Sequence, residues 1–395
     1  MADTKTKILA SSAAQLETES AFDVLSRAQK RAAAGHPVIN LGIGQPDFQT
    51  SAYIVEAAVK ALRDGQHGYT AAPGTAELRA GVAAYYDQFF GLAVDPDSVL
   101  VVPGGKVTMA FAMMLLGEAG REILYPDPGF PIYRSMAGYS GARPVPYALH
   151  EEKGFSFSAD EILDRVNDNT RLIILNSPGN PTGGSNLEGE VEALARGLEA
   201  FPNCAVLSDE IYSRLYFDGA RHLSLLQFEA LRDRLIVLDG WSKTYAMTGW
   251  RLGWGIWPAS MIGAATKLAI NIHSCVNAPA QAAALAALDG PQDDVETMRT
   301  AFQARRDLIH TRLNALPGVT AARPKGAFYA FPNISGLGLS AQQVQDQWLE
   351  DLNVAAIAGT SFGAAGEGYV RLSFANSAEN IEAALDRIEG WVKRL

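Results

Sequence analysis

Four short apolar runs in the middle of the chain restrict its fold more than any other feature of the sequence. Each run is apolar throughout rather than alternating, each is bounded by polar or turn residues, and several have helical patterns between them. A strand of this kind is buried on both faces, which is typical of a parallel sheet covered by helices. We therefore predict an α/β fold with a mostly parallel sheet. The runs are "RLIILN" (171–176), "AVLSD" (205–209), "LIVLD" (235–239) and "LGWGIW" (252–257).

Local signals place further elements before these runs. Apolar residues recur on one face of 51–64, and Gly65 suits the end of that helix. Thr75 is a good N-cap for the next helix, and Ser158 with Glu161 has the pattern of a capping box. Further strands are predicted at 98–102, 122–126 and 143–149.

The character of the sequence changes after about residue 290. A long charged helical stretch leads there into short apolar runs and two more helices, an arrangement typical of an α+β domain. The length of 395 residues also suits two domains, or one large and one small. We predict an N-terminal segment, 1–45, that packs with a small C-terminal domain, 291–395, and a large domain, 46–290, between them.

Composition argues against several classes of function. The net charge is −10, with 33 basic and 43 acidic residues and no basic run, so nucleic acid and anionic membranes are not expected partners. The N-terminal residues lack the apolar core of a signal peptide and no apolar run is long enough to span a bilayer, which predicts a cytoplasmic protein. Cys204 and Cys275 are far apart and the 6 histidines have no metal-ligand spacing, so neither a disulfide scaffold nor a metal site is predicted.

The residues that follow each predicted strand are the candidates for a ligand site, because ligands bind at the carboxyl ends of parallel strands. The stretch "PGGK" (103–106) opens a helix, where free backbone N–H groups suit a phosphate. Asn180 lies in a rigid loop rich in Pro and Gly. Asp209 and Tyr212 follow another strand, and Lys243 follows a fourth. Taken singly, each of these also fits a plain turn, an N-cap or a surface lysine.

Together these residues suit one ligand, pyridoxal 5′-phosphate. This cofactor has a dianionic phosphate, a basic ring nitrogen, a phenolic oxygen and an aldehyde that needs an amine. Lys243 and Arg251, two cations among apolar neighbours, support the same interpretation. Buried cations are costly unless something negative lies beside them, and the cofactor phosphate supplies that charge.

Eight motifs then form an ordered set along nearly the whole chain. They are "GIGQPDF" (42–48), "GYTAAPGTAELR" (68–79), "PGGK" (103–106), "PDPGFPIY" (126–133), "NSPGNPTG" (176–183), "SDEIY" (208–212), "SKTYAMTGWRLGW" (242–254) and "YVRLSFA" (369–375). With these motifs the chain resembles the fold-type I pyridoxal-phosphate enzymes of the class I/II aminotransferase family, in the aspartate-aminotransferase-like branch. The resemblance implies a large domain with a mostly parallel sheet flanked by helices, and a smaller α+β domain.

The resemblance also implies roles in binding the cofactor. Lys243 resembles the Schiff-base lysine, Asp209 the partner of the pyridine nitrogen, and Arg251 the phosphate-binding arginine. Asn180 and Tyr212 resemble the residues that hydrogen-bond the phenolic oxygen. The other implied contacts are Phe130 on the ring face, Gly104, Gly105, Lys106 and Ser242 at the phosphate, and Tyr69 at the phosphate of a partner subunit.

Two positions depart from the family pattern. Many members carry Ser or Thr where this chain has Gly240, and Ser242 is expected to take over as phosphate ligand. Phe130 stands where some members have Trp, a common variant that leaves the chemistry unchanged.

The substrate contacts are likewise implied by the resemblance. Arg371 resembles the arginine that holds the substrate α-carboxylate, with Asn180 as a second polar contact. Gly44 is expected to let the chain approach that carboxylate closely. Phe22 lies where similar chains line the mouth of the pocket and favours apolar or aromatic substrates. No motif assigns a residue to a distal carboxylate, so the sequence does not select the amino donor.

The implied activity moves the α-amino group of an L-amino acid to a 2-oxo acid such as 2-oxoglutarate, by a ping-pong reaction in a homodimer with shared active sites. Lys243 is both the Schiff-base lysine and the proton carrier. Two alternatives stay open at this point. A carbon–sulfur β-lyase on the same scaffold shares the first steps of the reaction. A non-catalytic effector-binding domain shares the fold, although the acidic net charge argues against a regulator that binds DNA.

Overall fold

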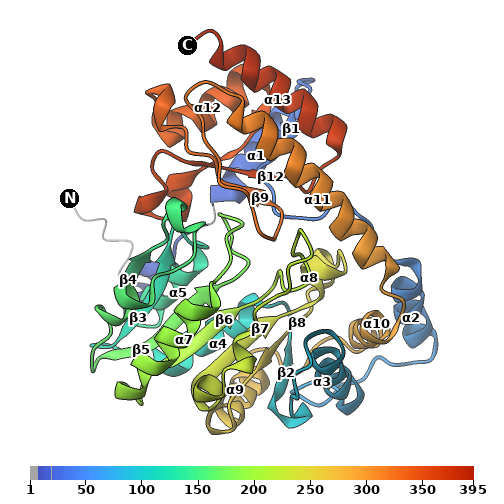
Figure 1. Cartoon of the computed structure of the whole chain (residues 1–395). Coiled ribbons are helices and arrows are strands. Elements are labelled where there is room, and N and C mark those ends of the chain that lie inside the picture. The colour runs from blue at the N-terminus through green and yellow to red at the C-terminus, as the bar shows by residue number, and fades with distance from the viewer. Residues whose placement is uncertain (1–7, 19) are drawn as a thin grey trace.

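A central sheet of seven strands organises the larger part of the molecule (Figure 1). The structure is a computed structural model that describes residues 8–18 and 20–395. The strands are β2 Val99–Val102, β3 Glu122–Asp127, β4 Arg143–Ala148, β5 Thr170–Asn176, β6 Ala205–Asp209, β7 Leu235–Asp239 and β8 Gly253–Ile256. They lie in the order β2-β8-β7-β6-β5-β3-β4. Strands β3 to β7 are parallel, which confirms the prediction of a mostly parallel sheet.

One of the four apolar runs has the opposite direction. β8 lies antiparallel to both β2 and β7. All four of its residues are buried, as they are in β2, so the apolar character that predicted a strand is the same in either direction. At the other end of the sheet, β4 is an edge strand, and its Pro144 and Pro146 are tolerated because an edge strand has no second neighbour to pair with.

Helices cover both faces of this sheet. Alternate residues of one strand point to opposite faces, so Ile173 and Leu175 of β5 join one hydrophobic core, and Leu172 and Ile174 join another. The first core is completed by α2 Ala52–Arg63, α3 Ala76–Phe90, α6 Ala159–Leu163, α7 Glu188–Gly197 and α10 Ala278–Asp289. The second core is completed by α4 Lys106–Leu116, α5 Ile132–Tyr139 and α9 Ala259–Ile272.

The local helix signals have mixed outcomes. The Thr75 side chain accepts a hydrogen bond from the backbone N–H of Leu78, and Gly65 after α2 has a positive φ, as predicted. The capping box at Ser158 is wrong, since the Ser158 side chain makes no cap hydrogen bond. Glu161 instead lies 3.0 Å from Nε2 of His150, a partner supplied by the preceding loop.

Among the described N-terminal residues, those of η2 Ser11–Gln15 pack on α5 of the larger part, whereas those of α1 and β1 pack with the C-terminal third of the chain. The elements involved are α1 Ser20–Ala33, β1 Ile39–Asn40, α11 Asp293–Asn314, β9 Tyr329–Ala330, α12 Ala341–Leu352, β10 Val354–Ala355, β11 Ile357–Ala358, β12 Val370–Ser373 and α13 Ala378–Val392. β1 pairs in parallel with β10, and β11, β12 and β9 form an antiparallel sheet. Arg27 of α1 bonds Asp346 of α12 at 2.6 Å. Figure 1 shows α1 and β1 in blue beside these orange and red elements.

The division of the chain at about residues 45 and 290 stays a proposal. The core that β1 shares with the C-terminal elements favours it, but residues 11–17, which were expected to pack with the small domain, contact α5 of the larger part. That core contains Ile39 and Leu41 together with residues of α11, α12 and α13. Among residues 8–18 and 20–395, no helix combines the length and apolar character that crossing a membrane requires.

Candidate active site

A cavity of about 520 Å³ lies at the carboxyl ends of β5 and β6, where the sequence placed the site. Its walls come from both parts of the molecule, since α1 and β12 contribute as well as the central sheet. The predicted site residues that line it are Phe22, Gly44, Gly105, Lys106, Phe130, Asn180, Asp209, Tyr212, Ser242, Lys243, Arg251 and Arg371. The fold therefore gathers residues from nearly the full length of the chain.

The floor of the cavity is a buried acid. Asp209 ends β6 and is 5% exposed. Its Oδ2 accepts a hydrogen bond from the hydroxyl of Tyr133 at 2.7 Å, and its Oδ1 accepts one from the backbone N–H of Ile211 at 3.3 Å. Burial raises the pKa of Asp209 from its ordinary value of 3.8 to about 6, and the Tyr133 hydrogen bond works against that rise. The side chain is thus mostly anionic at neutral pH but within reach of protonation.

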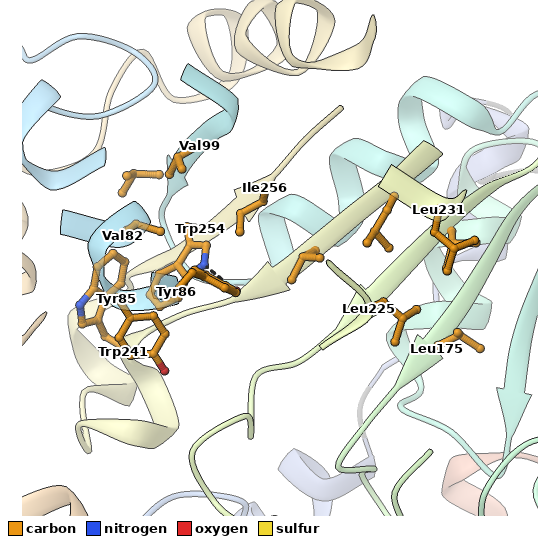
Figure 2. Close-up of a cluster of buried hydrophobic side chains, with 14 of the residues drawn as sticks. Val82, Tyr85, Tyr86, Val99, Leu175, Leu225, Leu231, Trp241, Trp254 and Ile256 are labelled. Carbon is orange, nitrogen blue, oxygen red and sulfur yellow. Dashed lines mark hydrogen bonds between the residues drawn. The ribbon is translucent and has the colours of Figure 1, made fainter. Parts of the chain in front are cut away.

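Lys243 lies on the short helix α8, Trp241–Thr244, which a buried aromatic cluster holds in place. Trp241 packs edge-on against Trp254 of β8 with ring centroids 4.5 Å apart, and its Nε1 donates to the carbonyl of Ala284 at 2.9 Å. Figure 2 shows the two indoles together in this cluster. The Nζ of Lys243 donates to the carbonyl of Gly44 at 2.6 Å. The amine is therefore positioned by packing beneath it and by a backbone contact above.

A guanidinium lies against the start of α4. Gly104 has a φ of +95°, and a Cβ at this position would lie 2.1 Å from Nη2 of Arg251. Arg251 also has a positive φ, and its Nη1 donates to the carbonyl of Thr248 at 3.0 Å. Only glycine at 104 leaves room for the arginine beside the first turn of α4. The unpaired N–H groups of a helix start and a guanidinium together favour an anion.

The departure at Gly240 has a steric cause. A Cβ there would lie 2.7 Å from the Cα of Gly253 and 3.0 Å from the carbonyl oxygen of Leu252. A serine or threonine at this position would therefore force β8 away from α8. Ser242 is buried and lines the cavity, close to the place where a phosphate ligand was expected.

The second guanidinium of the site is held flat between aromatic rings. Arg371 of β12 donates from Nη1 to Oδ1 of Asn180 at 2.9 Å and from Nη2 to the carbonyl of Gly42 at 2.5 Å. Its Cζ lies 4.6 Å from the ring centroid of Tyr329 and 4.7 Å from that of Phe362. Contacts with two rings and hydrogen bonds to two acceptors fix the orientation of the planar group.

Tyr329 also connects two other predicted residues. Its hydroxyl lies 2.9 Å from the hydroxyl of Tyr212. A Cβ on Gly44 would lie 2.1 Å from the same Tyr329 oxygen. Glycine at position 44 is thus required by the approach of a tyrosine hydroxyl, a reason that the sequence did not reveal.

Comparison with known proteins identifies the fold and the family. The family model described as aminotransferase class I and II matches residues 36–388. An aspartate aminotransferase of Pyrococcus horikoshii is 39% identical over 362 residues, which cover 91% of this chain and 92% of the relative. This chain belongs to the class I and II aminotransferase family.

Further family members extend the comparison. Aromatic-amino-acid aminotransferase 2 of Thermococcus litoralis is 36% identical over 361 residues, 90% of this chain and 92% of the relative. The solved aspartate aminotransferase of Thermus thermophilus with maleate has a TM-score of 0.92 and 31% identity, and covers 97% of this chain and 99% of its own. The α/β fold and the aminotransferase activity are therefore established. The comparisons do not favour the lyase or the effector-binding alternative.

Enzymes of this family use pyridoxal 5′-phosphate as their cofactor, and the residues present here fit it. Gly104 leaves a space beside its Cα that the Arg251 guanidinium fills, which sets a cation against a helix start as a phosphate requires. A buried acid, Asp209, is available for a basic ring nitrogen, and an amine, Lys243, for an aldehyde. The cavity thus offers a group of suitable charge for each polar part of the cofactor.

Two predicted residues lie outside the cavity lining. Gly104 lies behind it and shapes it through Arg251. Tyr69 is 93% exposed and lines a separate surface groove of about 680 Å³ together with Thr70 and Gln281. The structure therefore does not bring Tyr69 to the other site residues of its own chain.

The sequence missed two tyrosines of the site. Tyr133 was inside a quoted motif, three residues after Phe130, but nothing local marks it as a contact of Asp209, which lies 76 positions away. Tyr329 was inside "AFYAF" (327–331), an apolar run of the predicted second domain in which no single residue was assigned a role. Both line the cavity and both contact a predicted site residue.

Proposed function

We propose that this aminotransferase moves the α-amino group of an L-amino acid to 2-oxoglutarate in a ping-pong reaction, with Lys243 as the cofactor-binding and proton-carrying residue. The observation that carries the proposal is the meeting of Lys243, Asp209 and Arg371 in one cavity. When bound, pyridoxal 5′-phosphate supplies an aldehyde for an amine and a ring that withdraws electrons from the substrate Cα. The cytoplasmic location remains a prediction from the sequence.

Lys243 is the proposed base. Its Nζ contacts the Gly44 carbonyl, at the boundary between the central sheet and the N-terminal segment, so it can reach a substrate held between the two. The Lys243 amine would take the proton from the substrate Cα and hold it as an ammonium for the return step. A positioned base of this kind contributes about 10²–10⁴-fold to a rate.

Asp209 is the proposed partner of the ring nitrogen. With a pKa of about 6 it is largely ionised at neutral pH, and its charge holds a proton on that nitrogen. Tyr212 and Asn180 are the proposed donors to the phenolic oxygen. The Asn180 Oδ1 accepts from Arg371, which leaves its Nδ2 as a donor toward the cavity.

Arg371 is the proposed receptor for the substrate α-carboxylate. A planar fork held between the rings of Tyr329 and Phe362 loses little freedom when it pairs with a carboxylate. The same carboxylate would lie near the N-terminal segment, where the Gly42 carbonyl already accepts from Arg371. Orientation of the substrate by this pair sets its Cα toward Lys243.

Lys106 supports a substrate with a second carboxylate. Its ammonium lies in the cavity, 5.2 Å from the ring centroid of Phe130 and 5.9 Å from that of Phe22. The backbone N–H of Lys106 is proposed for the phosphate, and its side-chain ammonium lies between these two rings at the mouth of the cavity, where it is the proposed contact for a distal carboxylate. The dicarboxylate maleate in the Thermus thermophilus relative supports aspartate and 2-oxoglutarate as the pair.

Phe22 supports a second candidate, an aromatic amino donor. It is 57% exposed at the cavity, where an aromatic substrate side chain could cover it. A panel of amino donors with 2-oxoglutarate decides between the two. For a dicarboxylate enzyme, Lys106→Ala raises KM for aspartate by about 10–100-fold and leaves KM for phenylalanine nearly unchanged. An equal change for both donors contradicts the role of Lys106.

The proposed functional unit is a homodimer. Tyr69 is too exposed to serve the cavity of its own chain, which supports its placement at the phosphate of a second copy. A two-fold dimer would give two equivalent sites, each completed by the other subunit.

The central test uses the two lysines that line the cavity, Lys243 and Lys106. Reduction of the holoenzyme with borohydride followed by peptide mapping should find the cofactor on Lys243. Lys243→Ala should lose the adduct and at least about 10³-fold in activity, because proton transfer and attachment fail together. Lys106→Ala should keep the adduct. Cofactor trapped on Lys106 in the unmodified enzyme contradicts the assignment.

A single-turnover experiment separates transfer from elimination. With an amino acid and no acceptor, the proposed enzyme should release one 2-oxo acid per site and retain the amino group until a second 2-oxo acid is added. A lyase would continue to release ammonia under the same conditions, and that result would overturn the ping-pong proposal.

A further inference from the structure

The acid at the floor of the cavity has a partner that the proposed chemistry has not used. Tyr133 lies in the first turn of α5, and its hydroxyl donates to Oδ2 of Asp209 at 2.7 Å. Both side chains are buried, and Tyr133 itself also lines the cavity. A donor to a buried carboxylate acts on both its direction and its charge.

The choice of acceptor separates this tyrosine from an ordinary buried one. Tyr147 of β4 is equally buried, and its hydroxyl donates to the backbone carbonyl of Ile174 at 2.7 Å. A backbone acceptor satisfies a buried hydroxyl fully. Tyr133 instead contacts the one carboxylate that the proposed function assigns to the ring nitrogen. The contact spans 76 positions of sequence, so it results from the packing of α5 on the central sheet, whose strand β6 ends at Asp209.

The groups around Asp209 have opposite effects on its pKa. Burial raises its pKa and nearby Glu210 raises it further, whereas the Tyr133 hydroxyl, the Ile211 N–H and, more weakly, the Lys243 ammonium lower it. Tyr212 and Asp239 also lie near enough to interact with its charge. Of the groups that favour the anion, Tyr133 has the largest effect.

Tyr133 can only donate in this pair. Burial, and next the charge of Asp209, raise the pKa of the Tyr133 phenol well above its ordinary value of 10.0. The phenol therefore keeps its proton over the whole range in which Asp209 titrates. Phe130, which lies just before α5, meets the Tyr133 ring edge-on with centroids 5.7 Å apart, so the segment that presents a ring to the cavity also packs against the donor.

We propose that Tyr133 is a positioning residue for Asp209, which holds the carboxylate in one orientation at the cavity floor and favours its charged form for a protonated ring nitrogen. This proposal rests on the proposed role of Asp209. It predicts that the hydroxyl matters for ligands with a basic ring nitrogen and not for ligands of the same shape without one.

The test measures binding to the apoenzyme with two probes, pyridoxal 5′-phosphate and its 1-deaza analogue, in which carbon replaces the ring nitrogen. Tyr133→Phe should weaken binding of pyridoxal 5′-phosphate about tenfold relative to the analogue, since one pKa unit is a tenfold change in a protonation equilibrium. The relative loss should grow as pH falls toward the pKa of Asp209, because more of the variant is then neutral. The ratio of the two dissociation constants cancels general damage to the pocket.

Tyr147→Phe is the matched control, because it also removes one buried tyrosine hydroxyl, but one that bonds a backbone carbonyl and not Asp209. It should leave the ratio of dissociation constants at the wild-type value. If Tyr133→Phe leaves the ratio unchanged, or if both variants shift it equally, the proposal is overturned. Site-specific replacement of Tyr133 by 3-fluorotyrosine, a stronger donor of nearly the same size, should shift the ratio in the opposite direction, and no shift would count equally against the proposal.

The Asp209→Asn variant distinguishes the proposal for Tyr133 from the proposed role of Asp209 at the ring nitrogen. If Asp209→Asn leaves the ratio at the wild-type value, the role of Asp209 at the ring nitrogen fails. If Asp209→Asn changes the ratio and Tyr133→Phe does not, the positioning role of Tyr133 fails alone.

Discussion

The two ends of the cavity are built in different ways. At the acidic end, Asp209 is buried and already bonded to Tyr133 within the same chain. At the basic end, Arg251 is exposed, and Tyr69, which is proposed to help it, lies in a separate groove. The acidic end is therefore organised by packing before any ligand arrives, whereas the basic end is proposed to depend on the phosphate and on a second subunit. This contrast predicts that variants at the two ends fail in different ways.

The largest effect is expected at the acidic end. Asp209→Ala should lower kcat by about 10²–10³-fold, the usual loss when one preorganised electrostatic group is removed. The variant should still bind cofactor, because the basic end is intact. Steady-state rates at saturating cofactor, with cofactor content measured by absorbance, check both statements. A variant with near-normal turnover would remove Asp209 from the mechanism.

The opposite pattern is expected at the basic end. Arg251→Ala should weaken cofactor binding by about 100-fold while kcat at saturating cofactor falls much less, because the guanidinium pairs with phosphate and not with the reacting atoms. Arg251→Lys, which keeps the charge but loses the fork, should show a smaller loss of affinity. Equilibrium titration of the apoenzyme gives the dissociation constants. A large drop in kcat with unchanged cofactor affinity would contradict the assignment of cofactor binding to the basic end and of catalysis to the acidic end.

A smaller loss of cofactor affinity is expected when Tyr69, the residue proposed to reach the phosphate of the partner subunit, is changed. Tyr69→Phe should weaken cofactor binding by about tenfold, as expected for one hydrogen bond to a charged group. Mixed dimers of Tyr69→Ala and Lys243→Ala subunits should have one site with both lesions and one with neither, and should recover about half of the wild-type activity. Confirmed heterodimers without recovered activity would place Tyr69 in its own chain or in no site.

The smallest effect concerns stability, and it again distinguishes the acidic end. The pKa of Asp209 is about 6 in the folded protein and near 4 in an unfolded chain, so the folded state binds more protons between these values and stability falls as pH rises through them. Asp209→Asn removes this dependence. The apoenzyme variant should melt a few degrees (about 1–3 °C) higher than wild type at neutral pH and equally at pH below about 4. A lower melting temperature at neutral pH would contradict the buried charge as a source of strain.

The strands of the central sheet could be predicted because each one carries its own local signal in the sequence. The run 235–239 predicted a buried strand, and the structure has β7 over the same residues. The direction of β8 was not readable, since burial on both faces gives the same composition in either direction. The prediction of a capping box at Ser158 was wrong because the Glu161 side chain contacts His150 of a neighbouring loop instead.

The site was predictable where chemistry dictates residue type and not where packing does. Lys243, Asp209 and Arg371 were assigned through their motifs, and the fold brings them to one cavity. Tyr133 and Tyr329 act through contacts that span 76 and 117 positions, and no local pattern encodes such a meeting. Gly44 was assigned to the right cavity, but the steric demand that fixes it comes from a tyrosine on a distant strand.

The pairing of β1 with β10 sets an order of assembly during synthesis. Ile39 pairs with Val354, so the N-terminal segment leaves the ribosome long before its partner strand exists. At synthesis rates of about 5–20 residues per second, that segment waits for tens of seconds while the central sheet is completed. The apolar side of α1 stays uncovered throughout this interval. The N-terminal segment is therefore the part of the nascent chain most accessible to chaperones and proteases. It is covered only when the C-terminal third has been made and β10 can pair with β1.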